Sequence, residues 1–207
     1  MMKEASLHGV ALVGSRLQHA MGAPGTTGQW LRLLPISLLL NAGMLAAGIP
    51  TGLVRLQPVK DARSLGWAAA YVMMRSILEE LVFRVCMLPH PLADGHMSAA
   101  TFAKAAIIPG VLFVLSHMLT TQRSPDKVLR DARFLVICTF LAVSCTTTYF
   151  LTGGSYWAAV YMHFALVYPY VALLGGWKTT HTPTPMRKRA VGIDLSPAPV
   201  EDVRKVR

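Results

Sequence analysis

Two adjacent glutamates and an arginine lie inside an otherwise apolar stretch of the sequence, SILEELVFRVCMLPH at residues 76–90. Glu80 and Arg84 are four residues apart, so on a helix they share one face and can form an ion pair. Glu79 points about 100° away from Glu80, and Arg75 could pair with it in the weaker orientation. A charged group at the centre of a membrane helix costs at least about 2.5–3.5 kcal/mol. The stretch therefore predicts either two structural ion pairs, or a supporting Glu80–Arg84 pair that leaves Glu79 free to move protons.

Two histidines in later apolar segments could complete a site with Glu79. His117 lies in FVLSHML (113–119) and His163 in YWAAVYMHFALVY (156–168). Ionisable residues at membrane depth face the interior of a helix bundle, so these three side chains are expected to meet. One chemistry that suits them is a zinc site with an open position for water. The other is a metal-free site in which Glu79 and His117 activate water and His163 stabilises an oxyanion.

The composition indicates that membrane helices must position these side chains. Apolar residues make up 53% of the chain and charged residues only 14%, against about a quarter charged in soluble domains, and the mean hydropathy is +0.44. The 20 Lys+Arg outnumber the 10 Asp+Glu, but they cluster between apolar runs, as membrane topology requires, rather than in a nucleic-acid patch. We therefore expect a lipid-embedded protein with no nucleic-acid partner.

Five segments are long enough, or nearly so, to cross a bilayer, which takes about 20 apolar residues. The first of them contains Asn41 and could instead be a tilted or re-entrant piece. The expected fold is all-α, a polytopic transmembrane bundle of about five spans at residues 31–49, 65–88, 99–119, 133–152 and 155–175.

The connections between these segments alternate in charge. Arginines and lysines occur at 50–64 and 120–132 and are missing from 89–98 and from the turn at Gly153. The positive-inside rule then places the basic connections and the C-terminus in the cytosol.

The chain divides into three parts on this pattern. Residues 1–28 form an N-terminal leader that could be flexible, and a signal peptide is rejected because its apolar core is short and interrupted by His8. Residues 29–177 form the transmembrane helical domain. Residues 178–207, rich in proline and charge, are expected to be a disordered basic cytosolic tail.

The depths of Glu79 and His117 do not match on straight, parallel helices. Glu79 lies about 21 Å along its span from residue 65, whereas His117 lies near the cytosolic end of its own span. A kink at Pro109, or a break within the 65–88 segment, is one way to bring the two side chains together.

Three strings of the sequence resemble the motifs of the CPBP and Abi intramembrane protease superfamily: EELVFR (79–84), F-x-x-x-H (113–117) and a histidine in the last span. The longer string EELVFRVCMLP (79–89) is similar to the eukaryotic type II CAAX prenyl endopeptidases, over about residues 65–176. The resemblance implies an integral membrane hydrolase of the endoplasmic reticulum. Such an enzyme removes the C-terminal tripeptide from farnesylated or geranylgeranylated CAAX proteins.

The resemblance also implies a role for each matching residue. Glu79 and His117 would activate the water, and His163 would hold the developing oxyanion. The supporting residues would be Glu80, Arg84 and Phe113. It implies a metal-free mechanism without a cofactor, whereas a metalloenzyme would bind zinc through Glu79, His117 and His163.

One position departs from the family pattern. The third motif usually reads His-x-x-x-Asn, but Val167 stands four residues after His163. Valine cannot donate to an oxyanion, and losing one such donor typically costs about 10²–10³ in rate. We expect weak proteolysis, or another donor such as Tyr161 or Tyr168. Two alternatives stay open: a CPBP-type protease of non-prenylated peptides, and a catalytically dead scaffold of the same fold, which Val167 favours.

Overall fold

The fold was obtained as a computed structural model, which describes residues 2–22, 26–52, 54–91, 93–95, 97–120 and 132–175. Within these residues the chain forms helices and no strand, so the predicted all-α class is confirmed. The elements are α1 (Met2–Gly22), α2 (Thr27–Gly48), α3 (Ala62–Glu80), the π-helix η1 (Leu81–Cys86), α4 (Ala99–Thr120), α5 (Ala132–Leu151) and α6 (Tyr156–Leu173). The predicted tail at 178–207 and most of the 120–132 connection lie outside the described residues.

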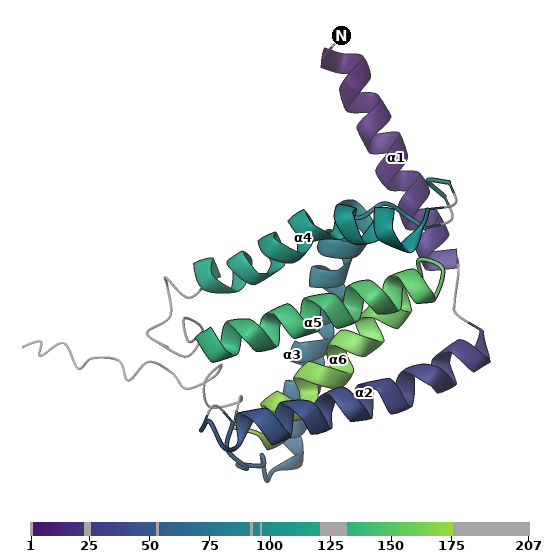
Figure 1. Ribbon diagram of the computed structural model, residues 1–207. Coiled ribbons are helices and arrows are strands. Elements are labelled where there is room, and N and C mark those ends of the chain that lie inside the picture. Colours follow the sequence, from purple (N-terminus) through teal and green to yellow (C-terminus); the bar gives the residue numbers. More distant parts are fainter. Residues whose placement is uncertain are drawn as a thin grey trace, which may run out of the picture.

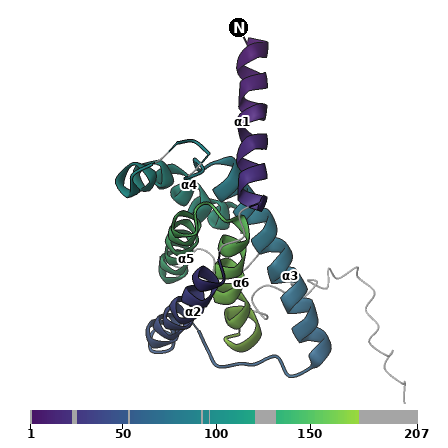
Figure 2. The ribbon, with the colours of Figure 1, turned by 90° about the vertical axis from the view of Figure 1, so that its right-hand side faces the viewer.

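Helix α6 lies at the centre of the bundle. It packs against α3, α5 and α2, and Figure 2 shows it between α3 on one side and the row formed by α4, α5 and α2 on the other. Helix α1 covers most of the predicted leader and projects away from the bundle (Figure 1). Side chains on different faces of α6 can therefore meet residues from three other helices.

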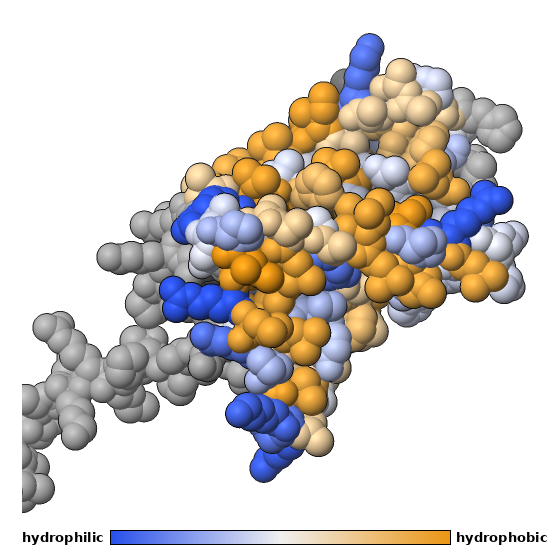
Figure 3. All heavy atoms as spheres, turned by 60° about the horizontal axis from the view of Figure 1, so that its bottom comes forward, coloured by the Kyte–Doolittle hydropathy of each residue, from blue (hydrophilic) through white to orange (hydrophobic). Residues whose placement is uncertain are grey.

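Three of the five expected spans, α2, α4 and α5, are long and apolar enough to cross a membrane. The other two, α3 and α6, are also helical, and they carry the polar residues Glu79, Glu80 and His163. Much of the face drawn in Figure 3 is apolar, with the most hydrophilic side chains towards its edges. The predicted polytopic helix bundle is thus confirmed, and α2 is one continuous helix of 22 residues rather than a re-entrant piece.

Helix α3 begins and ends at recognisable signals. Asp61 is its N-cap and accepts a hydrogen bond from the Ser64 N–H at 2.7 Å, which satisfies one of the free amides of the first turn. This hydrogen bond lowers the pKa of the Asp61 carboxyl. At Leu81 the α-helix passes directly into the π-helix η1, which carries Arg84. The predicted 65–88 segment is therefore continuous helix as far as Cys86, and its change to a π-helix lies beyond Glu79 rather than as a break before it.

A polar contact joins α2 to α6. Pro169 has no N–H, so the carbonyl of Ala165, one turn earlier, has no donor within its own helix. The side-chain amide of Asn41 donates to that carbonyl at 2.9 Å and also to the Ser37 carbonyl at 2.8 Å. Asn41 therefore fastens α2 to α6.

The 89–98 connection packs against α1 and the α5–α6 turn. Arg16 donates to Asp94 at 2.8 Å, and the same carboxylate accepts the backbone N–H of His90. Gly154 has φ +91°, and a Cβ there would lie 2.3 Å from His90 Nε2. The close approach requires glycine, and burial lowers the pKa of the His90 imidazole.

Candidate active site

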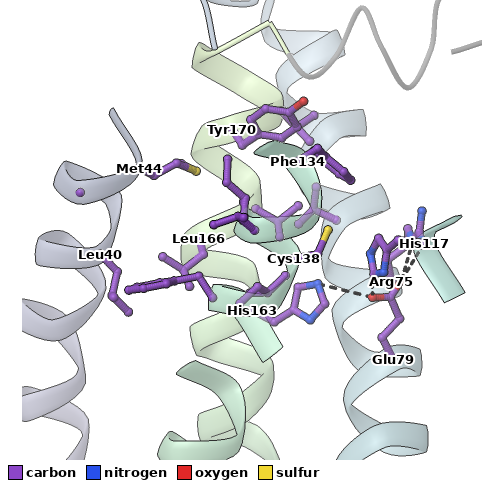
Figure 4. A pocket seen from close by; sticks show the side chains of 18 of the residues that line it. Leu40, Met44, Arg75, Glu79, His117, Phe134, Cys138, His163, Leu166 and Tyr170 are labelled. Atoms are coloured by element: carbon purple, nitrogen blue, oxygen red, sulfur yellow. Dashed lines mark hydrogen bonds and ion pairs between the residues drawn. The ribbon is translucent and has the colours of Figure 1, made fainter. Parts of the chain in front are cut away.

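A cavity of about 620 Å³ opens between α2, α3, α5 and α6, with His117 of α4 at its wall. Figure 4 shows Arg75, Glu79 and His117 gathered at one side of the cavity, Leu40 and Met44 at the other, and His163 between them. Most of the remaining wall is apolar. The cavity thus joins a small polar site to a larger apolar space.

Helical periodicity explains which side chains reach this space. Tyr71, Arg75 and Glu79 are spaced by four residues, so they lie on one face of α3, and all three line the cavity. Glu80 is rotated by about 100° and points instead into the protein core, where it is fully buried. His163 and Val167 share a face of α6 in the same way, and both line the cavity.

The two oxygens of Glu79 have different surroundings. Oε1 accepts hydrogen bonds from Arg75, with Nε at 2.9 Å and Nη2 at 2.5 Å. Oε2 is buried without a hydrogen-bond partner among the described residues. It lies 3.9 Å from His117 Nε2 and 3.8 Å from His163 Nε2, both beyond hydrogen-bond length. The structure thus brings together the three residues that the sequence predicted to meet.

The other nitrogen of each imidazole fixes its tautomer. His117 Nδ1 lies 2.9 Å from the Phe113 carbonyl, and His163 Nδ1 lies 2.8 Å from Glu80 Oε1. A carbonyl and a carboxylate oxygen can only accept, so both Nδ1 atoms carry the hydrogen. In the neutral rings, each Nε2 then presents a lone pair towards Glu79 Oε2. A water molecule at the junction of these three acceptors could donate both of its hydrogens.

Glu80 and Arg84 form the ion pair that their four-residue spacing predicted. Both are fully buried, with Arg84 Nε 3.0 Å from Glu80 Oε2, an ionic contact that falls short of a directional hydrogen bond. Arg84 also donates to the Ala142 carbonyl at 3.2 Å, and its guanidinium lies 5.5 Å from the centre of the Phe113 ring. These contacts tie η1 to α4 and α5 and hold Glu80 beneath His163.

Phe113 lies beside the site, where the sequence placed it. Its ring is fully buried, packs edge-on against Phe83 at 5.1 Å between centroids, and lies 4.7 Å from the His117 ring. Together with its carbonyl hydrogen bond, this packing restricts the orientation of His117.

The apparent mismatch in depth between Glu79 and His117 has a geometric origin. Figure 1 shows α3 running across the direction of α4 and α5 rather than alongside them. The position of a residue along α3 therefore does not correspond to the same depth along α4. A residue at the end of α3 can meet His117, which is in the last turn of α4.

The two tyrosines expected as substitute donors lie elsewhere. Neither Tyr161 nor Tyr168 lines the cavity, because the Tyr161 hydroxyl is 3.5 Å from Ser37 Oγ and the Tyr168 ring stacks on Phe164. The expectation that Tyr161 or Tyr168 replaces the missing donor is therefore wrong, because each lies on a face of α6 turned away from the cavity. The sequence did not single out Tyr71 among the polar residues of the cavity, although its four-residue spacing from Arg75 was a usable signal.

Two sets of side chains carry donor atoms of the kinds that bind a metal ion. The described residues whose ligand atoms all lie within 4.8 Å of one another are Glu80, Cys145 and His163. There the guanidinium of Arg84, 3.0 Å from Glu80, opposes a cation. The predicted zinc ligands Glu79, His117 and His163 have suitable donor atoms. These atoms, however, do not all lie within 4.8 Å of one another.

Comparison with known proteins identifies the family of this chain. A family model described as Type II CAAX prenyl endopeptidase Rce1-like matches residues 61–168, slightly more than half of the chain. No curated protein and no solved structure matched the chain. The matched segment runs from the N-cap of α3 to the residue after Val167 and includes Glu79, His117 and His163. The chain therefore belongs to the Rce1-like type II CAAX prenyl endopeptidase family of membrane proteases.

Proposed function

We propose that this membrane protease removes the C-terminal tripeptide from CAAX proteins that carry a farnesyl or geranylgeranyl group. The observation that carries the proposal is the free, buried Oε2 of Glu79, facing two imidazole nitrogens at one end of an apolar cavity. A prenyl chain is apolar and suits the wall of that cavity, where Leu39, Leu40 and Met44 lie. The peptide next to it would then reach Glu79.

The reaction follows from the positions of the acceptors. Glu79 Oε2 and His117 Nε2 take a proton from water, and the resulting hydroxide attacks the carbonyl carbon of the prenylated cysteine. The carbonyl oxygen becomes an oxyanion. His163 keeps its Nδ1–H on the Glu80 carboxylate and can donate to the oxyanion from Nε2 when the ring carries a second proton.

Collapse of this tetrahedral intermediate cleaves the peptide bond. The C–N bond breaks as the stored proton passes from Glu79 or His117 to the leaving nitrogen. The products are a prenylcysteine carboxylate and a tripeptide with a free amine. No metal ion or cofactor is required by these steps.

A peptide assay tests the proposed function. Purified protein in lipid is incubated with an S-farnesylated CAAX peptide, and mass spectrometry follows the released tripeptide, with the same peptide lacking the farnesyl group as the control. We expect release from the farnesylated peptide alone. Equal release from both peptides would favour a protease of non-prenylated substrates. No release from either, by folded protein, would favour the scaffold function that Val167 suggests.

We also propose that the protein resides in the endoplasmic reticulum, as the family resemblance implies, and that its C-terminus lies in the cytosol, because basic residues concentrate at 50–64 and in the tail. Single cysteines at Ser98 and Ser196 test this in sealed microsomes, with the native Cys86, Cys138 and Cys145 replaced by alanine. A membrane-impermeant maleimide should label position 196 and spare position 98, which is exposed. Labelling of position 98 without lysis would reverse the orientation.

A further inference from the structure

We propose that Arg75 is a catalytic residue for this reaction, one that donates an N–H to the oxyanion formed at the scissile carbonyl. The inference rests on the proposed function and goes beyond it, because it assigns a donor at a wall where Val167 supplies none. It is carried by the contacts of the Arg75 guanidinium and by the composition of the cavity wall.

The guanidinium of Arg75 retains free donors inside the cavity. Arginine has five N–H groups. Nε and Nη2 donate to Glu79 Oε1, and Nη1 donates to the Tyr71 hydroxyl at 3.2 Å. These three contacts leave two N–H groups without an acceptor among the described residues. The side chain is 41% exposed, against 16% for Glu79, so a substrate in the cavity can approach it.

The other donors near Glu79 are poorly placed for this task. His117 Nε2 faces the attacking water, and Val167 offers only methyl groups to the cavity. Cys138 also lines it, but a thiol is a weak donor. His163 can donate only when it is protonated. Arg75 is always charged, and its charge-assisted hydrogen bonds are roughly twice as strong as neutral ones.

Distance favours the oxyanion over the substrate's terminal carboxylate as the partner of Arg75. The guanidinium touches Glu79, with Nη2 2.5 Å from Oε1, so its free N–H groups lie beside the carbonyl that water attacks. The terminal carboxylate lies three residues beyond the scissile bond. At about 3.3 Å per extended residue, this places it about 10 Å away.

A rescue experiment separates this role from simple support of Glu79. Arg75→Met should lower kcat on the farnesylated peptide by about 10²-fold or more, the usual effect of removing one oxyanion donor, with a smaller change in KM. Val167→Asn places an amide on the same cavity wall. It should raise kcat only a few-fold in the native background, but by about tenfold or more in the Arg75→Met background.

Several outcomes overturn the inference. If Arg75 only holds Glu79 in place, an amide at position 167 cannot replace it, and Val167→Asn will give the same small gain in both backgrounds. A kcat for Arg75→Met within about threefold of the native value also contradicts the proposal. Arg63→Met is the matched control, because it removes an arginine from the exposed first turn of the same helix and should leave kcat unchanged.

Arg75→Lys covers the case in which Arg75→Met folds poorly. It keeps the positive charge beside Glu79, so it should fold, but its compact ammonium lacks the planar fork that reaches Glu79 and the oxyanion together. Its kcat should therefore respond to Val167→Asn more than that of the native protein does. Lack of that response overturns the inference. Failure of the native protein to cleave the farnesylated peptide would instead overturn the proposed function, so the two failures are distinguishable.

Discussion

Glu79 and Glu80 are neighbours in sequence, yet the fold surrounds them differently. Glu80 is fully buried, and both of its oxygens have partners, His163 on one and Arg84 on the other. Glu79 has one oxygen bound by Arg75 and the other free, facing a cavity. The rotation of about 100° between successive helix positions sends one carboxylate into the core and the other to the cavity wall. A fully paired carboxylate can support structure, whereas a half-paired one can exchange a proton.

The largest expected effect on stability falls on the Glu80 side of this comparison. Arg84→Met removes the cation from a fully buried pair and should cost about 3–5 kcal/mol, measured as loss of folded protein in a thermal unfolding assay. Arg75→Met is the matched variant, and it should cost much less because its pair with Glu79 is partly exposed. An equal loss of stability in Arg84→Met and Arg75→Met would contradict the proposal that the Glu80–Arg84 pair supports the fold and the Glu79–Arg75 pair does not.

The two histidines provide a second, smaller contrast. His163 donates to the buried Glu80 carboxylate, and a hydrogen bond to a charged group contributes about 1.5–3 kcal/mol. His163→Ala should therefore lower both stability and activity. His117 donates to a backbone carbonyl, so His117→Ala should lower activity with a loss of stability below about 1.5 kcal/mol. The comparison fails if His117→Ala is the more destabilising variant.

The smallest expected effect is that of metal removal. The proposed mechanism uses only side chains, so dialysis against 1,10-phenanthroline should leave tripeptide release within experimental error of the untreated protein. Loss of activity that added zinc restores would show that tripeptide release depends on a metal, and would contradict the metal-free mechanism.

Local spacing was sufficient to predict much of the site. Four-residue separations place Glu80 with Arg84, and Arg75 with Glu79, on common helix faces whatever the tertiary structure. The cost of burying charge in a membrane then requires Glu79 and the two histidines to face inward. Each of these features is set within one helix at a time, so the sequence alone is enough to predict it.

The relations between helices could not be obtained in this way. Periodicity gives a face of each helix but not its neighbour, so the sequence offered Tyr161 or Tyr168 as a substitute donor, although neither lines the cavity. It also treated the spans as parallel, whereas α3 crosses α4. The contact between Asn41 and the Ala165 carbonyl joins segments 124 residues apart. Crossing directions and such contacts arise from packing of whole helices, which no local pattern encodes.

The central claim is that Glu79 is the base and Glu80 its support, and one paired measurement tests it most directly. Glu79→Gln and Glu80→Gln are compared with the native protein for folded fraction and for tripeptide release from the farnesylated peptide, expressed per folded molecule. Glu79→Gln should fold normally and lose release by about 10²–10⁴-fold, the usual contribution of a general base, whereas Glu80→Gln should mainly reduce the folded fraction. Release by folded Glu79→Gln at the native rate would contradict the account.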